Sequence, residues 1–444
     1  MLDKGKSKMG EDDRRWGRRY TFQNQRLLYW PMIHAGDFDL MQGFFKHYLR
    51  VLPMRKAITK MWFDIDGAYY RENIQACGDE IGDGGMFNWL EKDGVFAMDN
   101  SKPRPPRRHL MPAVEKNGSQ EARPQEEIGG ELLPNKTGPG DYSAMGYHNF
   151  HFNSGLEISY MALEYYRHTL DENFLNKTLL PIAREVLLFF DKRYPRGADG
   201  KLVLEPGQAL ETYWYTRNAT PDVAGLRAVL EGLLKIKNIP ADCRRDWSRF
   251  LREIPEVPTR KLGDGTLVLA PAELIKSVRL NGECPELYAA FPYEIFSVAK
   301  KNEQIVRDTM PVRGAKNGVC WNQDEIFYAY AGMAKDASNL LFRRFSLYGE
   351  NESKLPMFSC AFNDYIPDLD NNGSGSVALQ KMLIQEDGDK IALLPAWPKN
   401  WDCKFKLRAA KNTILSGEIK GGKLLNLSVV PSSRAKDVEV CELQ

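Results

Sequence analysis

Paired amphipathic segments with short polar connections are the sequence feature that most limits how this chain can fold. Apolar residues recur at three- and four-residue spacing in GLEISYMALEYYRHT and again, after LDEN, in FLNKTLLPIAREVLLFFDKRY. The segments PDVAGLRAVLEGLLKI and ADCRRDWSRFLREI repeat this arrangement, as do QDEIFYAYAGM and DASNLLFRRFSLY. Such successive helical hairpins, without a 34- or 40-residue repeat, favour a closed toroid of helices over an open solenoid.

Two further parts of the chain complete this predicted architecture. Near the start, GDFDLMQGFFKHYLRVLP predicts a helix and MRKAITKMWFDI its return helix. From Lys390 the apolar period changes from 3.6 to 2 in KIALLPAW, CKFKLRA, NTILSGEIK and KLLNLSVVP. The sequence therefore predicts a mainly α protein with a small antiparallel β-domain at residues 390–444.

Composition and charge exclude several functions. The 61 Lys and Arg residues balance 59 Asp and Glu, so the chain is not expected to bind nucleic acid through a basic surface. No run of 18 apolar residues predicts a membrane span, and the first twenty residues lack the apolar core of a signal peptide. The seven cysteines are scattered without a CxxC pair, which disfavours a zinc site. We expect neither a metal nor a cofactor.

Residues 99–141 differ from the rest of the chain. They contain seven prolines, many charges and no Phe, Trp or Tyr. This composition cannot bury a core and predicts a long exposed loop.

A carboxyl group beside aromatic residues marks the first candidate site. LEPGQALETYWYTRNATPD places Glu211 next to Tyr213, Trp214 and Tyr215 between two predicted helix pairs. A carboxyl against aromatic rings can lose water, which raises its pKa and suits it to general-acid catalysis. Alternatively, Glu211 caps a helix or pairs with Arg217.

A second candidate site is rich in carboxylates and amides. CAFNDYIPDLDNNGSGS contains Asp370 and Asn371 directly before a predicted helix. DLDNNG fits the first half of a calcium loop, but Leu379 stands where the loop needs its bidentate Glu. These residues could also form a turn before Ser374 or Ser376 caps the helix.

Two more segments offer sugar-binding side chains. YTFQNQRLLYWP combines Asn24 with Trp30, and amides and flat rings suit the hydroxyls and C–H faces of sugars. Core packing would explain Trp30 equally well. HNFHFN contains His148 and His151, whose spacing is weak evidence for a metal and somewhat better evidence for substrate contact. All six histidines precede residue 170, which excludes a Ser-His-Asp triad with a late histidine.

Taken in order, these segments resemble the six-hairpin glycosidases, specifically proteins related to glycoside hydrolase family 95 and an uncharacterised relative of that family. The shared phrases are FQNQRLLYWP with GDFDLM, LEPGQALET, CWNQDEI around Trp321, and LLPAWPKNWDCKFKLRAAKNT. The similarity extends from Trp16 onward. It implies a six-hairpin (α/α) toroid at residues 16–389 in front of the β-domain. Relatives carry an N-terminal β-sandwich that this chain is expected to lack.

The resemblance also implies roles for single residues. Pro206 and Glu211 match the spacing of the family's general acid, and Asp370, twelve residues before Met382 of MLIQ, matches its catalytic base. Asn24 matches the second of two asparagines that hold the attacking water, whereas Phe22 stands at the first. The expected substrate contacts are Trp30, His148, His151, Trp214, Trp321 and Asn371.

The activity implied is that of an inverting, exo-acting glycosidase, with carboxyls about 6.5–9.5 Å apart. Its substrate would be a terminal sugar of an oligosaccharide or polysaccharide, such as an α-L-fucoside or α-L-galactoside. A polysaccharide lyase, a phosphorylase and a truncated sugar-binding remnant remain as alternatives. Relatives are typically exported bacterial enzymes, so the full-length protein is expected in the periplasm or outside the cell.

Overall fold

The computed structural model describes residues 20–74, 89–92, 95–98, 150–316, 321–345 and 369–444. The predicted loop at 99–141 lies outside these ranges, as does Trp16.

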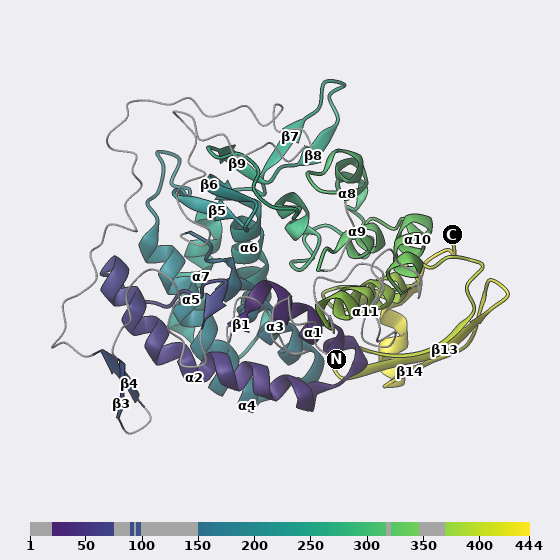
Figure 1. Cartoon of the computed structure of the whole chain (residues 1–444). Coiled ribbons are helices and arrows are strands. Elements are labelled where there is room, and N and C mark those ends of the chain that lie inside the picture. Colours follow the sequence, from purple (N-terminus) through teal and green to yellow (C-terminus); the bar gives the residue numbers. More distant parts are fainter. Residues whose placement is uncertain (1–19, 75–88, 93–94, 99–149, 317–320, 346–368) are drawn as a thin grey trace, which may run out of the picture.

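Four helices stand side by side through the middle of the molecule (Figure 1). Each of these helices buries apolar residues against the next. In their order of packing they are α11 (Leu369–Leu383), α1 (Phe22–Ala35), α3 (Asn153–Thr169) and α6 (Thr220–Lys235).

Further helices extend this inner series and cover its outer side. The short helix η6 (Pro285–Ala289) contacts α6, and α9 (Asp324–Tyr330) packs on α11. The outer helices are α2 (Phe38–Phe63) on α1, α5 (Leu180–Arg193) on α3, α7 (Ala241–Glu253) on α6, and α10 (Ala334–Phe345) on α9 and α11. Short helical turns connect them: α4 (Glu172–Phe174), η5 (Leu175–Leu179), α8 (Gln304–Thr309) and η7 (Met310–Val312).

The two helices predicted on either side of Pro53 are one continuous helix, α2, so the prediction of a break there is wrong. A proline inside a helix costs about 3 kcal/mol. Buried apolar residues on both sides of Pro53, including Tyr48, Val51 and Ile58, offset this cost, because each contributes about 1.5–3 kcal/mol.

Glycines set the closest helix contacts. A Cβ atom added to Gly373 of α11 would overlap the backbone of Leu27 in α1. At Gly232 of α6 an added Cβ would overlap Leu163 of α3, and at Gly225 it would lie 2.8 Å from the Tyr293 ring. The α11–α1 and α3–α6 contacts therefore depend on positions that carry no side chain.

A three-stranded sheet lies over the start of α6. β5 (Gly207–Ala209), β6 (Tyr213–Ala219) and β9 (Ala272–Ile275) pair antiparallel in this order. Ala272 and Ile275 of β9 pack with Ala209 of β5 and Tyr213 of β6 in a small apolar cluster. The other small strands are β1 (Tyr20–Thr21) with β2 (Asn73–Ile74), β3 (Trp89–Lys92) with β4 (Val95–Met98), and β7 (Thr259–Lys261) with β8 (Leu267–Leu269).

Strands dominate the C-terminal part, as the change of period predicts. The first of these strands begins at Ile384. The division into two domains between residues 389 and 390 stays a prediction. Most pairs are antiparallel, but β11 and β15 pair parallel. The elements are β10 (Ile384–Asp387), β11 (Lys390–Leu393), β12 (Cys403–Ala409), β13 (Thr413–Lys420), β14 (Lys423–Val430), η8 (Ser432–Asp437) and β15 (Val438–Val440).

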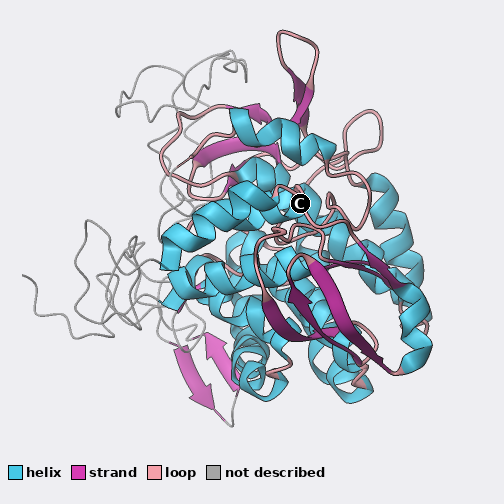
Figure 2. Cartoon of the chain, turned by 90° about the vertical axis from the view of Figure 1, so that its right-hand side faces the viewer, coloured by secondary structure: helices cyan, strands magenta, loops and turns pink. Residues whose placement is uncertain are grey.

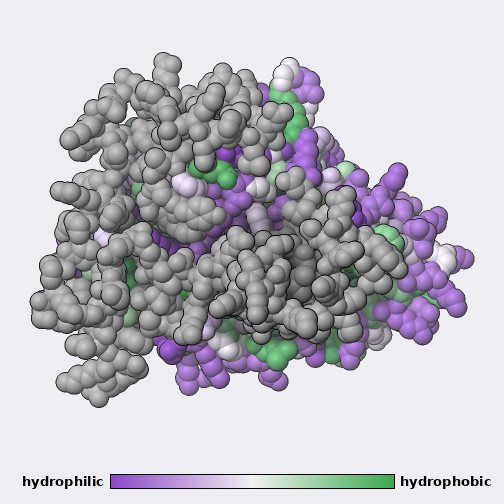
Figure 3. All heavy atoms as spheres, viewed as in Figure 1, coloured by the Kyte–Doolittle hydropathy of each residue, from purple (hydrophilic) through white to green (hydrophobic). Residues whose placement is uncertain are grey.

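The C-terminal strands stand beside the helices rather than among them (Figure 2). β12 contacts α1, and the surface around β13 and β14 is largely hydrophilic (Figure 3). None of the helices in the described ranges has the length and apolar character needed to cross a membrane. The molecule is thus mainly α, with small sheets.

The α11–α1 contact gives a first testable prediction. Gly373→Ala should lower the free energy of unfolding by about 1–3 kcal/mol, because the new methyl group has no space against Leu27. Gly43→Ala in α2 is the matched control: nothing lies within 4 Å of its Cβ position, so stability should stay equal or rise slightly. Urea unfolding of both variants measures this, and equal stability of the two would contradict the packing argument.

Candidate active site

The first turns of α1 and α11 meet at a hydrogen bond. Asn24 Nδ2 donates to Oδ2 of Asp370, although 346 residues separate them in the chain. Gly373 follows Asp370 by three residues in α11, and Leu27 follows Asn24 by three residues in α1. The contact of Gly373 with Leu27 therefore lies about one helical turn further along the same two helices. The close packing there therefore places Asp370 beside Asn24. Asp370 is 2% exposed.

Glu211 lies in the turn that connects β5 to β6. Its Oε2 accepts a hydrogen bond of 2.7 Å from Asn281 Nδ2, and its backbone carbonyl accepts one of 2.8 Å from Trp214 Nε1. The pairing of β5 with β6 fixes the turn, and Glu211 is only 6% exposed. The alternative in which Glu211 pairs with Arg217 is not what the structure shows, because Arg217 binds Glu205 at 2.7 Å.

Glu283 connects Glu211 to α1. One of its oxygens accepts a hydrogen bond from Gln23 Nε2, the neighbour of Asn24. The other accepts from the backbone N–H of Glu211 at 3.0 Å and from the Thr212 hydroxyl at 3.3 Å. A continuous series of contacts thus runs from Asp370 through α1 and Glu283 to Glu211.

A third carboxyl group, that of Glu72, adjoins this series. Glu72 is 1% exposed and accepts a hydrogen bond from the backbone N–H of Gln23. His151 Nε2 lies 3.6 Å from its other oxygen. Two buried glutamates, Glu72 and Glu283, therefore contact the first turn of α1, and Glu211 adjoins Glu283.

Burial and mutual repulsion favour protonated carboxyls here. Burial first, and then the charge of Glu211, raise the pKa of Glu283 to about 8. The same two causes raise the pKa of Glu72 well above its ordinary value. Burial, with Arg26 nearby, lowers the pKa of His151 to about 3, so this imidazole is neutral at pH 7. Such strongly shifted, grouped titrations are a common property of catalytic sites.

A buried ion pair lies one turn below. Arg26 binds Glu157 at 2.9 Å and the Tyr288 hydroxyl at 2.6 Å, and Trp30 Nε1 donates to the same Glu157 oxygen at 2.7 Å. The Trp30 ring is 6% exposed and packs against Tyr160 and Phe291. This arrangement is that of a core residue, and a substrate role for Trp30 stays a prediction.

The start of α11 is fixed by a second buried cation. Arg344 of α10 donates to Asn371 Oδ1 at 2.5 Å and to the Asn322 carbonyl at 2.8 Å, and it pairs with Glu325 of α9. Asn371 is fully buried and therefore supports α11 in this structure.

The structure brings most of the predicted site residues together. Asn24 touches Asp370, Trp214 holds the turn of Glu211, His151 faces Glu72, and Trp321 lines a small cavity with Glu283. His148 lies outside the described residues.

Sequence reasoning missed Glu72 and Glu283. Glu72 lies two residues after a pair of tyrosines and Glu283 lies three residues before Glu286, but neither segment belongs to the candidate motifs described above. Only tertiary structure brings them to α1.

One group of described residues has the composition of a metal site. Ligand atoms of His34, His168 and Glu386, all buried, lie within 4.8 Å of one another. Lys381 Nζ, however, lies 2.9 Å from His34 Nε2, so an ammonium group already stands at the nitrogen that would bind the metal. His168 Nε2 pairs with Glu386 at 3.1 Å. The group therefore fits a buried ion-pair network better than a metal site.

Comparison with known proteins identifies the fold. No family model matches the chain, and no curated protein matches it. Among solved structures, one described as "Putative kojibiose phosphorylase from human microbiome" has a TM-score of 0.56 at 10% identity. The match covers 93% of this chain and 60% of that one, so the chain spans about three fifths of its length. The chain therefore shares its overall fold with that structure, and its architecture is that of a mainly α (α/α) toroid with small sheets. The finer resemblance to family 95 receives no support from these comparisons.

The low pKa of His151 predicts how stability depends on pH. The unfolded chain binds a proton on this residue near pH 6.5, whereas the folded protein does not until about pH 3, so acidification favours unfolding. Between about pH 6 and pH 4, the free energy of unfolding of the His151→Asn variant should fall less steeply with acidification than that of the unmodified protein. The difference in slope should be up to about 1.4 kcal/mol per pH unit. Urea midpoints across this range measure it.

His34→Asn is a second variant for the same measurement, because burial also lowers the pKa of His34 to about 3. Slopes identical to that of the unmodified protein in both variants would contradict the assignment of neutral, buried imidazoles.

Proposed function

We propose that this protein is a carbohydrate-active enzyme that hydrolyses a glycosidic bond, with Glu211 as general acid and Asp370 as general base. The observation that carries the proposal is the hydrogen-bonded series from Asp370 and Asn24 through Gln23 and Glu283 to Glu211. It joins four segments that lie far apart in the sequence, and it connects the two acidic residues that the resemblance selects. The toroid fold, shared with an enzyme described as a sugar phosphorylase, supports the substrate class.

The chemistry needs one proton donor and one acceptor on opposite faces of a sugar ring. Glu211 would give its proton to the glycosidic oxygen as the bond from that oxygen to C1 breaks. Asp370 would take a proton from water as the water oxygen bonds to C1, and Asn24, which touches Asp370, would orient that water. The products are a sugar with inverted anomeric configuration and the released alcohol.

Phosphorolysis is the second candidate, because the solved structure cited above is described as a phosphorylase. In that reaction phosphate replaces water as the nucleophile, and the acid remains necessary. Incubation of a glycan panel with and without inorganic phosphate separates the two reactions: sugar phosphate appears only in phosphorolysis. An unsaturated product absorbing in the ultraviolet would indicate a lyase, and binding without turnover a non-catalytic protein.

Loss of either carboxyl should abolish turnover. We expect Glu211→Gln and Asp370→Asn each to reduce kcat on natural oligosaccharides by about 10³-fold or more, because proton transfer accounts for rate factors of this order. For Glu211→Gln the loss should be smaller with aryl glycosides whose leaving group needs no protonation. Initial rates on both substrate types measure this.

Glu205→Gln is the matched control, since Glu205 lies in the same segment but is ion-paired with Arg217 and Lys276. It should retain turnover. Unchanged activity of the Glu211 or Asp370 variant would remove that residue from the mechanism.

The pair formed by Glu211 and Glu283 should affect how kcat/KM depends on pH. Two adjacent buried carboxyls lose their protons in two coupled steps, and repulsion by the charge of Glu211 is one cause of the raised pKa of Glu283, where the last proton of the pair is held. Glu283→Gln removes this repulsion and should move the basic limb of kcat/KM to lower pH by about one unit. A profile that does not move would show that Glu283 only supports the fold.

A further inference from the structure

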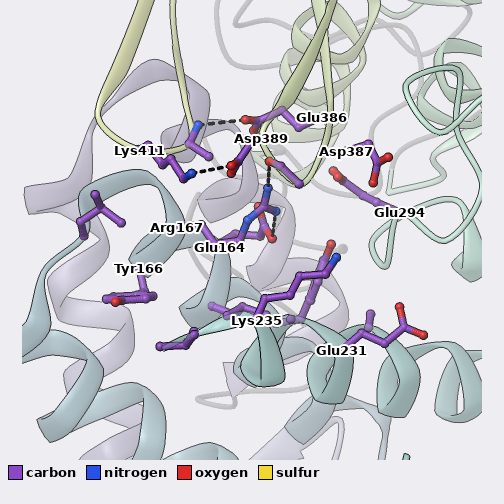
Figure 4. A pocket seen from close by; sticks show the side chains of 18 of the residues that line it. Glu164, Tyr166, Arg167, Glu231, Lys235, Glu294, Glu386, Asp387, Asp389 and Lys411 are labelled. Carbon is purple, nitrogen blue, oxygen red and sulfur yellow. Dashed lines mark hydrogen bonds and ion pairs between the residues drawn. The ribbon is translucent and has the colours of Figure 1, made fainter. Parts of the chain in front are cut away.

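A large cavity lies far from the candidate active site. It has a volume of about 740 Å³, within the roughly 300–1,000 Å³ range of small-molecule sites. Its wall combines the last turns of α3 and α6, the segment Tyr293–Ile295, and the turns that follow β10 and β12 (Figure 4).

The cavity and the carboxyl cluster occupy opposite ends of the same helices. Glu211 precedes α6, whereas Glu231 and Lys235, which line the cavity, lie in its last two turns. A helix of this length, 16 residues, spans about 24 Å. A molecule in the cavity therefore cannot reach Glu211 or Asp370.

Part of the cavity wall is fixed by ion pairs. Arg167 binds Glu164 at 2.5 Å and the Gly388 carbonyl at 3.0 Å, while Lys411 binds Asp389 at 2.5 Å (Figure 4). Glu294 is paired with Lys381, which stands behind the wall, at 2.7 Å. These contacts hold the wall in place and pair the charges of the residues that form them.

Five other charged groups on the wall have no partner. Within the described part of the chain, the carboxylates of Glu231 and Asp387 and the ammonium groups of Lys235, Lys237 and Lys300 form no hydrogen bond or ion pair. Three of these groups are hydrogen-bond donors and two are acceptors. Lys300 is half-buried, and burial, only partly offset by Glu294 and Asp387, lowers its pKa.

We propose that this cavity is a second, non-catalytic site that binds a neutral sugar chain through Glu231, Lys235, Lys300 and Asp387. The choice of a sugar as ligand rests on the proposed function. An enzyme that cleaves glycans encounters sugar chains, which are therefore available to bind in this cavity.

The charge pattern favours a neutral ligand over an ion. Both unpaired carboxylates and unpaired ammonium groups line the wall, so a polyanion or a polycation would meet repulsion as well as attraction. A sugar hydroxyl both donates and accepts, and can therefore form a hydrogen bond with either kind of group. The apolar wall, which includes Tyr166, Leu163 and Ile295, offers contact for sugar C–H faces.

Lysine footprinting tests the site directly. The protein is treated with an amine-acylating reagent in the presence of kojibiose, maltotriose, cellotriose or 2′-fucosyllactose, and the modification rate of each lysine is read by mass spectrometry. A ligand at ten times its Kd should slow modification of Lys235 and Lys300 about eleven-fold. Lys46 and Lys406, which do not line the cavity, should be modified at an unchanged rate.

Variants separate this site from the catalytic one. Protection of Lys300 should persist in Glu211→Gln, whereas Lys300→Met and Glu231→Gln should lose the protection of Lys235 and retain turnover. If sugars protect both lysines but no substrate is cleaved, the result supports the second site and contradicts the proposed hydrolase activity. If sugars are cleaved but none protects Lys300 at concentrations up to about 50 mM, enough to detect millimolar Kd values, the second site is refuted.

Discussion

The contact between α1 and α11 is the constraint on which the site depends. Gly373 lets the α11 backbone approach Leu27 of α1 more closely than any side chain would allow. One turn nearer the helix starts, the same approach brings Asp370 against Asn24. Arg344 holds α11 from its other side through Asn371. The position of the proposed base therefore follows from backbone packing rather than from a flexible loop.

The first turn of α1 organises the remaining carboxyls. Gln23 contacts both Glu72 and Glu283, and Glu283 in turn binds the backbone of Glu211. Three carboxyls can share this buried region because burial and repulsion raise the pKa of Glu72 and Glu283, which favours their neutral forms. Arg26, paired with Glu157 one turn below, adds a positive charge to the region. The arrangement can hold protons near neutral pH without a histidine.

The sequence predicted the helical hairpins, the C-terminal strands and the segments that carry Glu211, Asp370 and Asn24, because periodicity and composition are local properties. It did not predict the continuity of α2 through Pro53, since that depends on what the helix packs against. It placed Asp370 in a turn before a helix, whereas Asp370 is the second residue of α11. Glu72 and Glu283 could not be predicted, because only the tertiary fold brings them beside Gln23.

The most direct test of the account is the anomeric configuration of the first product. A substrate that the protein cleaves is followed by proton NMR before the released sugar mutarotates. We expect inversion, because in the proposed mechanism Asp370 acts on water held by Asn24 and forms no bond to the sugar. Retention would require a covalent glycosyl-enzyme intermediate and would contradict the roles assigned to Asp370 and Asn24.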